Sequence, residues 1–118
     1  ITTFGGHPVC CAAGNAALLI LQNEKLYDAA RLKGELLKRL LKHSAIREVR
    51  AIGLFMAVEF EDEDFCFRVL SECLKNGLVA DCFLFNKKSM RLAPPLIITG
   101  AEIGESCQLI LRSIEDVA

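Results

Sequence analysis

The spacing of apolar residues changes partway along the chain, and this change restricts the fold more than any other feature. From about Glu24 to His43, leucines and alanines recur at the spacing of one face of an amphipathic helix. From Val49 to Phe60 the apolar residues instead form a strand-like run that is entered through Gly53. Neighbouring segments with these two patterns predict a sheet that is covered by helices.

Turn and cap residues divide the rest of the chain into further elements. Asp62 and Asp64 can cap a helix that Gly77 ends in a left-handed conformation. Thr99 and Glu102 have the spacing of a capping box. The predicted elements are helices over about 8–22, 24–43 and 65–75, a strand over 49–60, strands over 78–85 and 89–92 joined by a turn at 86–88, and a final helix from residue 99.

The order of these elements predicts an α+β fold. We expect a small three- to four-stranded, mainly antiparallel sheet covered by helices, with a long N-terminal helical segment, and residues 1–118 as one domain. The first helix, from Pro8 to about Gln22, has apolar residues too dense for a surface stripe. We therefore expect other structure to enclose most of it.

Composition excludes several classes of function. The 118 residues include 14 Lys and Arg and 15 Asp and Glu, for a net charge of -1, and no basic stripe with aromatics, so we expect no nucleic-acid partner. No apolar stretch reaches the roughly 18 residues of a membrane span and the start does not resemble a signal peptide, so we expect no membrane and a cytoplasmic location. Hydrophobic residues make up 53%, which indicates some apolar surface for a neighbour.

The cysteines favour neither a metal site nor disulfides. They lie at positions 10, 11, 66, 73, 82 and 107. A zinc site needs closely spaced pairs such as C-x2-C, which this spacing lacks, and we expect no metal. We expect buried, reduced, structural thiols, with Cys66 and Cys73 on one face of a helix, as in a reducing compartment.

A glycine-rich loop over residues 2–8, T-T-F-G-G-H-P, leads directly into the first helix. Glycine allows close approach of the backbone, Pro8 suits the first helical position, and a helix N-terminus carries a partial positive charge. With the hydroxyl of Thr3, the loop has the groups that bind phosphate, although a tight turn without a ligand is the alternative. Because this element stands at the start of the chain, we expect the chain to be a piece of a larger protein.

Arg91 lies in a short apolar strand just before Leu92-Ala93-Pro94-Pro95. A guanidinium on such a rigid frame can bind a carboxylate through two hydrogen bonds. A solvated charge or an ion pair within the chain is the alternative.

Three further groups of residues have simpler explanations. The acidic residues in 59–64 lack EF-hand spacing and fit a solvated loop that caps a helix. The lysines fall on polar helix faces or in a turn, where none is desolvated as a catalytic lysine must be. His7 and His43 have no serine or cysteine partner in a nucleophile arrangement, and we expect both to be structural.

Three segments in combination resemble one known family. They are the loop T-F-G-G-H-P from Thr3, the run V-R-A-I-G-L-F-M-A-V-E from Val49, and the run R-L-A-P-P-L-I-I-T from Arg91. Their order and separations are similar to those in the C-terminal part of class III pyridoxal-phosphate-dependent aminotransferases, a group that includes ornithine and acetylornithine aminotransferases. The resemblance covers essentially the whole chain.

The resemblance implies roles for individual residues. Thr3, with Phe4 and Gly5, matches the loop that contacts the phosphate of pyridoxal 5'-phosphate held by the neighbouring subunit. Arg91 matches the arginine that binds the carboxylate of the substrate. His7 stands where many members have asparagine, and histidine is a poorer N-cap.

The resemblance also implies what the complete protein is. This chain would be the small C-terminal domain of a fold-type I enzyme, with residues 1–23 linking it to a large domain upstream that holds the catalytic lysine. That enzyme would be a homodimer that moves an amino group between an amino acid or amine and a keto acid. We expect this part alone neither to hold the cofactor nor to catalyse.

A free-standing α+β interaction or ligand-sensing module is the alternative function. It agrees with the small size and with the lack of catalytic residues in the chain. The apolar surplus would then belong to an ordinary dimer face.

Overall fold

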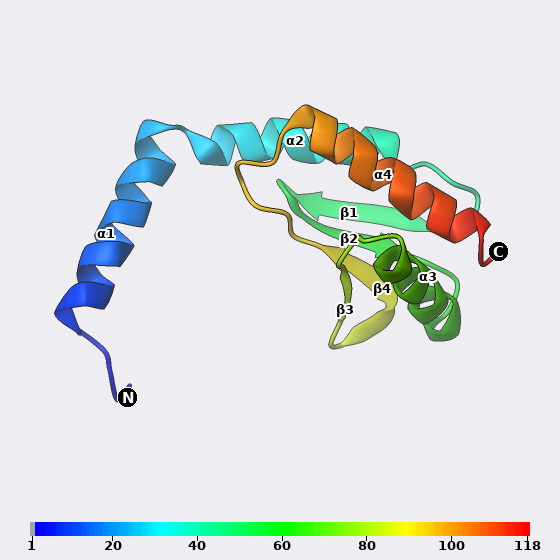
Figure 1. Ribbon diagram of the computed structural model, residues 1–118, viewed down its shortest axis with the longest axis horizontal. Coiled ribbons are helices and arrows are strands. Elements are labelled where there is room, and N and C mark those ends of the chain that lie inside the picture. The colour runs from blue at the N-terminus through cyan, green and yellow to red at the C-terminus, as the bar shows by residue number, and fades with distance from the viewer. Residues whose placement is uncertain (1) are drawn as a thin grey trace.

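The computed structural model describes residues 2–118 and consists of helices on one side of an antiparallel sheet, with one helix extending away from both (Figure 1). The elements in order are α1 (Pro8–Asn23), α2 (Leu26–Leu40), β1 (Glu48–Ile52), β2 (Phe55–Glu59), α3 (Glu63–Lys75), β3 (Asp81–Phe83), β4 (Asn86–Leu92) and α4 (Gly100–Glu115). The predicted α+β fold with a small antiparallel sheet is therefore confirmed.

The sheet has four strands in the order β1-β2-β4-β3, and every neighbouring pair is antiparallel. Its two central strands, β2 and β4, are distant in sequence, and their register pairs Met56 with Leu92 and Val58 with Met90. α3 lies between them in the chain, so the sheet can close only when this helix packs back onto it.

The strand predicted over residues 49–60 is two strands. A two-residue turn at Gly53 and Leu54 joins β1 to β2, and Gly53 has φ of 57°, which glycine tolerates best. The apolar run conceals this turn because Leu54, although in the turn, is buried. The glycine marks the hairpin rather than the entry to one strand.

The second hairpin is confirmed, but its turn lies earlier than predicted. β3 covers only Asp81–Phe83, and the turn falls at Leu84 and Phe85. The predicted turn residues 86–88 are the first residues of β4. The polar sequence N-K-K suits a turn, but here Lys87 and Lys88 lie in β4 and pair with Glu63 and Glu59.

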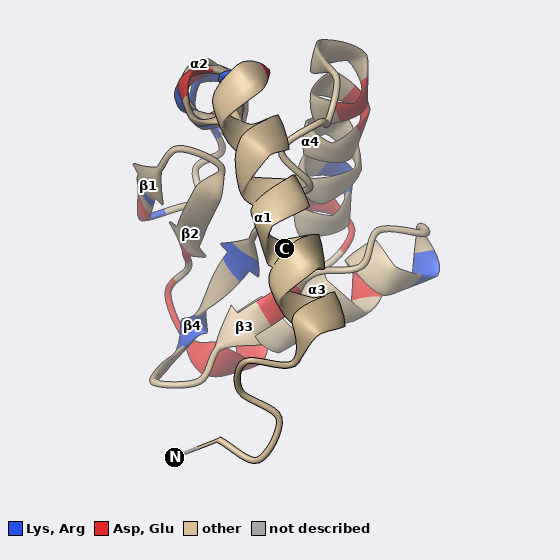
Figure 2. Ribbon diagram, turned by 90° about the vertical axis from the view of Figure 1, so that its left-hand side faces the viewer, with Lys and Arg blue, Asp and Glu red and all other residues tan. Residues whose placement is uncertain are grey.

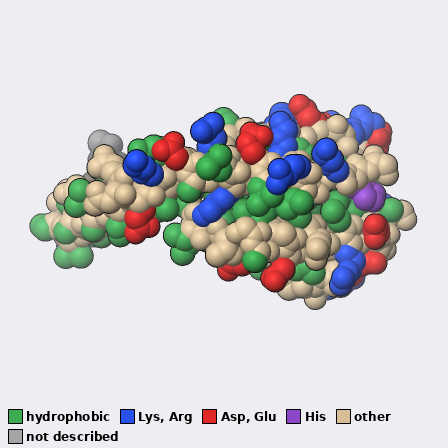
Figure 3. Space-filling model, turned by 90° about the horizontal axis from the view of Figure 1, so that it is seen from above, with side chains coloured by type: hydrophobic (Ala, Val, Ile, Leu, Met, Phe, Trp, Pro, Cys, Tyr) green, Lys and Arg blue, Asp and Glu red, His purple; other side chains and the backbone are tan. Residues whose placement is uncertain are grey.

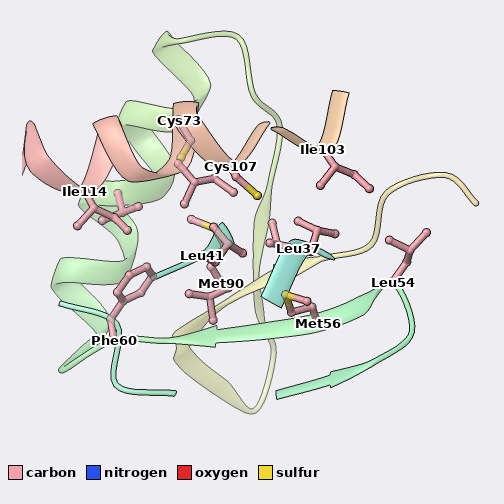
Figure 4. Packing of buried hydrophobic residues seen from close by; sticks show 14 of the residues in the cluster. Leu37, Leu41, Leu54, Met56, Phe60, Cys73, Met90, Ile103, Cys107 and Ile114 are labelled. Atoms are coloured by element: carbon pink, nitrogen blue, oxygen red, sulfur yellow. The ribbon is translucent and has the colours of Figure 1, made fainter. Parts of the chain in front are cut away.

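The core lies between the sheet and the helices α2, α3 and α4 (Figure 4). Met56, Val58 and Met90 are at most 1% exposed, and Met56 and Met90 point from the strands toward these helices. Cys66 and Cys73 share the buried face of α3, as predicted. The buried residues of α4 are Ile103, Cys107, Ile110, Ser113 and Ile114.

Helix caps agree with the sequence patterns. The side chain of Asp62 accepts a hydrogen bond from the Phe65 amide at 2.8 Å, and Gly77 has φ of 85° after α3. Thr99 and Glu102 form the complete capping box of α4.

The buried cysteines are inert structural thiols. Burial disfavours the charged thiolate and raises the pKa of Cys66 to about 12 and that of Cys107 to about 11.

The first helix differs from its prediction. α1 has no buried residue, and Cys10 and Cys11 are exposed rather than buried. Figure 1 shows why: α1 meets α2 at a sharp corner around Lys25, whose φ is 49°, and projects away from the sheet. The view from above shows hydrophobic side chains gathered on this projecting lobe (Figure 3). The expected enclosure of α1 does not come from the described residues of this chain.

The corner between α2 and the first hairpin depends on two glycines. A Cβ atom built on Gly34 would overlap the carbonyl oxygen of Gly53, so α2 approaches the β1–β2 turn more closely than any side chain permits. Gly104 in α4 has no neighbour within 4 Å of such a Cβ atom.

We therefore predict opposite effects for one substitution at these two helical glycines. Gly34→Ala should lower the free energy of unfolding by about 1–3 kcal/mol, because the backbone of the hairpin turn must move. Gly104→Ala should raise it by up to about 1 kcal/mol through helix propensity. Urea unfolding measures both, and a Gly34→Ala variant as stable as the original would contradict the close approach.

Candidate functional site

One row of residues crosses the sheet on the face opposite the helices. In register, Arg50 on β1 pairs with Ala57 on β2, Ala57 pairs with Arg91 on β4, and Arg91 pairs with Asp81 on β3. Met90 and Leu92, which flank Arg91, are buried against the helices, and successive side chains of a strand alternate between faces. Arg91 therefore points to the face that the helices leave open, and Figure 2 shows basic positions along β4.

Arg91 is held firmly at its backbone and loosely at its guanidinium. Its strand pairs on both sides, with β2 and with β3. Its side chain is 44% exposed, and Nη2 donates to Asp81 Oδ2 at 3.2 Å. Ala57, on the other side, offers neither charge nor a side-chain acceptor. Most of the guanidinium donors thus face open space on a fixed strand.

A hollow of about 320 Å³ lies at the end of β4, where Arg91 and the proline loop line it together with Leu37 of α2 and Ile103 and Ile110 of α4, on the helix side of the sheet. The proline loop after β4 is held by an amide bond from Ile98 to the Pro95 carbonyl at 3.0 Å. Lys33 of α2 donates from Nζ to the Leu96 carbonyl at 2.7 Å and ties the same loop to the helix.

The other arginine of the row, Arg50, is held by two carboxylates. Arg50 contacts Glu48, and its Nη2 donates to Glu59 Oε2 at 2.7 Å. Lys88 Nζ lies 2.7 Å from Glu59 Oε1. Hydrogen bonds from Lys88 and Arg50 lower the pKa of Glu59 to about 2. The hydrogen bonds that Arg50 donates to Glu59 and Glu48 raise the pKa of Arg50. This cluster is an ion-pair network that engages both Nη1 and Nη2 of Arg50, although the Arg50 side chain is as exposed as that of Arg91, at 44%.

The N-terminal loop has the predicted form. Gly6 has φ of 80°, the His7 amide donates to the Phe4 carbonyl at 3.3 Å, and Pro8 begins α1. The methyl group of Thr2 fills the space where a Cβ atom on Gly5 would lie. His7 occupies the N-cap without a side-chain hydrogen bond, as expected of a poor cap, so α1 starts with no side chain on its terminal amides.

The loop and Arg91 do not meet within the chain. Thr3, Phe4 and Gly5 are exposed at the far end of α1, while Arg91 lies on the sheet (Figure 1). The fold of one chain therefore does not bring the two groups to one ligand, and both roles stay predictions.

The remaining candidates have structural roles. In the acidic segment, Glu61 pairs with Arg47, and Asp62 caps α3. Across residues 2–118, no group of three or more His, Cys, Asp and Glu side chains is arranged to hold a metal ion. None of the helices described is long and apolar enough to cross a membrane.

Three features of the site could not be predicted from the sequence. Asp81 lies next to Arg91 on the neighbouring strand, and this pairing depends on the position of the turn in the β3–β4 hairpin. Ala57 leaves room beside Arg91 because β2 and β4 are neighbours, and Lys33 ties the proline loop across 63 residues of sequence. The spacing of Arg91 from the double proline was the available signal for this region.

Comparison with known proteins assigns the family. The model of the family described as aminotransferase class-III matches residues 1–114. The chain is 39% identical to an ornithine aminotransferase of Plasmodium yoelii yoelii over 122 residues, which cover 97% of the chain and 28% of that protein. It is 34% identical to a putrescine aminotransferase of Pectobacterium atrosepticum over 122 residues, covering 98% of the chain and 25% of that protein.

A solved structure agrees with both sequence relatives. The ornithine aminotransferase from Toxoplasma gondii, described with partial occupancy of PLP at its active site, superimposes with a TM-score of 0.84 at 35% identity, over 98% of this chain and 29% of that one. The chain thus spans about a quarter of the length of the curated relatives that it matches. The match over nearly all of its residues favours the family over an unrelated interaction module. The chain belongs to the class III aminotransferases.

Proposed function

We propose that this chain is the C-terminal part of a pyridoxal-phosphate-dependent aminotransferase and that Arg91 binds the carboxylate of the substrate. The observation that carries this proposal is the guanidinium of Arg91, exposed on a strand that is paired on both sides. A fixed guanidinium fits the two oxygens of a carboxylate, and each charge-assisted hydrogen bond contributes about 1.5–3 kcal/mol.

The N-terminal loop fits a phosphate group by its chemistry. It combines the hydroxyl of Thr3, the glycine turn at Gly5 and Gly6, and an α1 N-terminus whose cap residue makes no side-chain hydrogen bond. In this proposal Thr3, Phe4 and Gly5 contact the phosphate of pyridoxal 5'-phosphate bound mainly by the partner subunit. The distance between this loop and Arg91 in the fold supports an arrangement across a dimer.

The described part of the chain contributes positioning. Bound pyridoxal phosphate supplies an electron sink for amino-group transfer between an amino acid or amine and a keto acid. The lysines of the chain support a location of the catalytic lysine upstream. Four of the seven, Lys33, Lys75, Lys87 and Lys88, are held by a carbonyl or a carboxylate, and the other three, Lys25, Lys38 and Lys42, are exposed. The chain orients the substrate and covers part of its site.

The proposed dimer and upstream domain would also cover the exposed apolar surface. Leu18, Leu19 and Ile20 on α1 are all more than half exposed, which is unusual for neighbouring large apolar residues on one helix. In this proposal the large domain that precedes residue 1 and the second subunit pack on α1.

We predict that Arg91→Lys in the complete protein raises the KM for substrates that carry the carboxylate by about tenfold or more, because lysine cannot reproduce the fork of two hydrogen bonds. The dissociation constant for pyridoxal phosphate should stay within roughly twofold, since Arg91 does not contact the cofactor in this proposal. Steady-state kinetics and cofactor titration measure the two effects.

Arg50→Lys provides the matched control, because Arg50 stands in the same row but is occupied by Glu48 and Glu59. This variant should lose stability while its KM for the same substrates changes little. Equal effects of both substitutions on KM, or an unchanged KM in Arg91→Lys, would refute the assignment.

The loop generates a second prediction. Thr3→Val in the complete protein keeps the shape of the side chain and removes its hydroxyl, so the affinity for pyridoxal phosphate should fall about tenfold, as expected for one hydrogen bond to a charged group. Thr2→Val is the control, because Thr2 packs on Gly5 through its methyl group. Cofactor affinity that depends on Thr2 and not on Thr3 would overturn the proposed contact.

A further inference from the structure

We propose that Asp81 competes with the substrate for Arg91 and thereby tunes how strongly the complete protein favours ligands that carry a carboxylate. The inference rests on the proposed role of Arg91 and adds a specificity-determining residue to it. Asp81 and Arg91 are direct register partners on β3 and β4, and Arg91 Nη2 lies 3.2 Å from Asp81 Oδ2.

The structure keeps the Asp81 carboxylate beside Arg91. Its Oδ1 accepts a hydrogen bond from the Cys82 amide at 2.8 Å, which leaves Oδ2 directed at the guanidinium. Among the residues described, Asp81 is the acidic partner recorded for Arg91. Within the described part of the chain, the negative charge that an incoming carboxylate meets at this guanidinium is therefore that of Asp81.

The ion pair is open to exchange. Its side chains are 44% and 68% exposed, so both groups remain hydrated, and it consists of one contact at 3.2 Å. Arg50, by contrast, is held by Glu48 and by Glu59, the latter at 2.7 Å and only 15% exposed. Arg91 can thus leave its partner with little loss, whereas Arg50 cannot.

Asp81 is not needed to hold Arg91 in place. β4 is fixed by pairing with β2 and by the buried side chains of Met90 and Leu92. A ligand carboxylate must displace Asp81 or lie next to its charge, while an uncharged ligand meets no such repulsion. Asp81 should therefore weaken the binding of carboxylates selectively, and its removal should strengthen it.

The test compares the complete protein with its Asp81→Asn variant, in which the amide oxygen can still accept from Cys82. Two inhibitors of the same shape report on the site: valerate, which carries a carboxylate, and valeramide, which is uncharged. We expect the inhibition constant of valerate and the KM of carboxylate-bearing substrates to fall about threefold to fivefold. The kcat and the inhibition constant of valeramide should change less than about twofold.

Three further variants make the result specific. Glu63→Gln removes a different exposed pair of the same length, 3.2 Å to Lys87, and should leave all constants unchanged. Asp81→Ser should reproduce the effect of Asp81→Asn. In an Arg91→Lys background, Asp81→Asn should lose its selectivity for valerate over valeramide, because the forked pair of hydrogen-bond donors is gone.

The outcomes separate this inference from the proposed function. If Arg91→Lys weakens valerate but Asp81→Asn leaves its binding unchanged or weaker, Asp81 is no competitor and the inference is wrong. If Arg91→Lys leaves valerate binding unchanged, the proposed role of Arg91 fails instead. Equal tightening of valerate and valeramide by Asp81→Asn would also overturn the inference, because the effect would not depend on charge.

Discussion

The central position of β4 in the sheet is the constraint on which the rest of the structure depends. β4 pairs with β2 on one side and β3 on the other, and its residues Met90 and Leu92 enter the core on the face where α3 packs against β4. These contacts fix the backbone on both sides of residue 91. The alternation of a strand then directs the arginine away from the core. A charged group with rigid support and open surroundings is a direct consequence of this packing.

The two arginines of the row across the sheet have different surroundings. Arg50 binds Glu48 and Glu59 and joins the outer hairpin to the rest of the charged network. Arg91 has one exposed carboxylate for a partner and a small neighbour, Ala57. Several short contacts to carboxylates hold a guanidinium more strongly than a single long contact between exposed groups does. The distinction comes from the partners that the sheet places beside each guanidinium.

Local patterns in the sequence predicted the parts of the fold that depend on local interactions. Both capped helices, α3 and α4, and the order of elements are as expected, because a cap and its partner lie within a few residues of each other. The β1–β2 turn was missed because buried Leu54 continues the apolar run through it. The exposure of α1 could not be inferred, since a dense apolar pattern shows that a helix is to be covered but not which chain covers it.

In the site, too, local patterns were predicted and contacts between distant residues were not. Arg91 was identified from its strand and the double proline that follows, and its exposure agrees with a role in binding. Asp81 was not identified, because its pairing with Arg91 depends on the position of the hairpin turn. The polar residues 86–88 led to a turn predicted too late in the chain.

The most direct test of the account is a crystal structure of the complete protein with pyridoxal phosphate and a carboxylate substrate analogue. The account predicts both carboxylate oxygens within hydrogen-bonding distance of Arg91 and the Thr3 hydroxyl on the phosphate of the partner subunit's cofactor; both residues directed away from the cofactor cleft would contradict it.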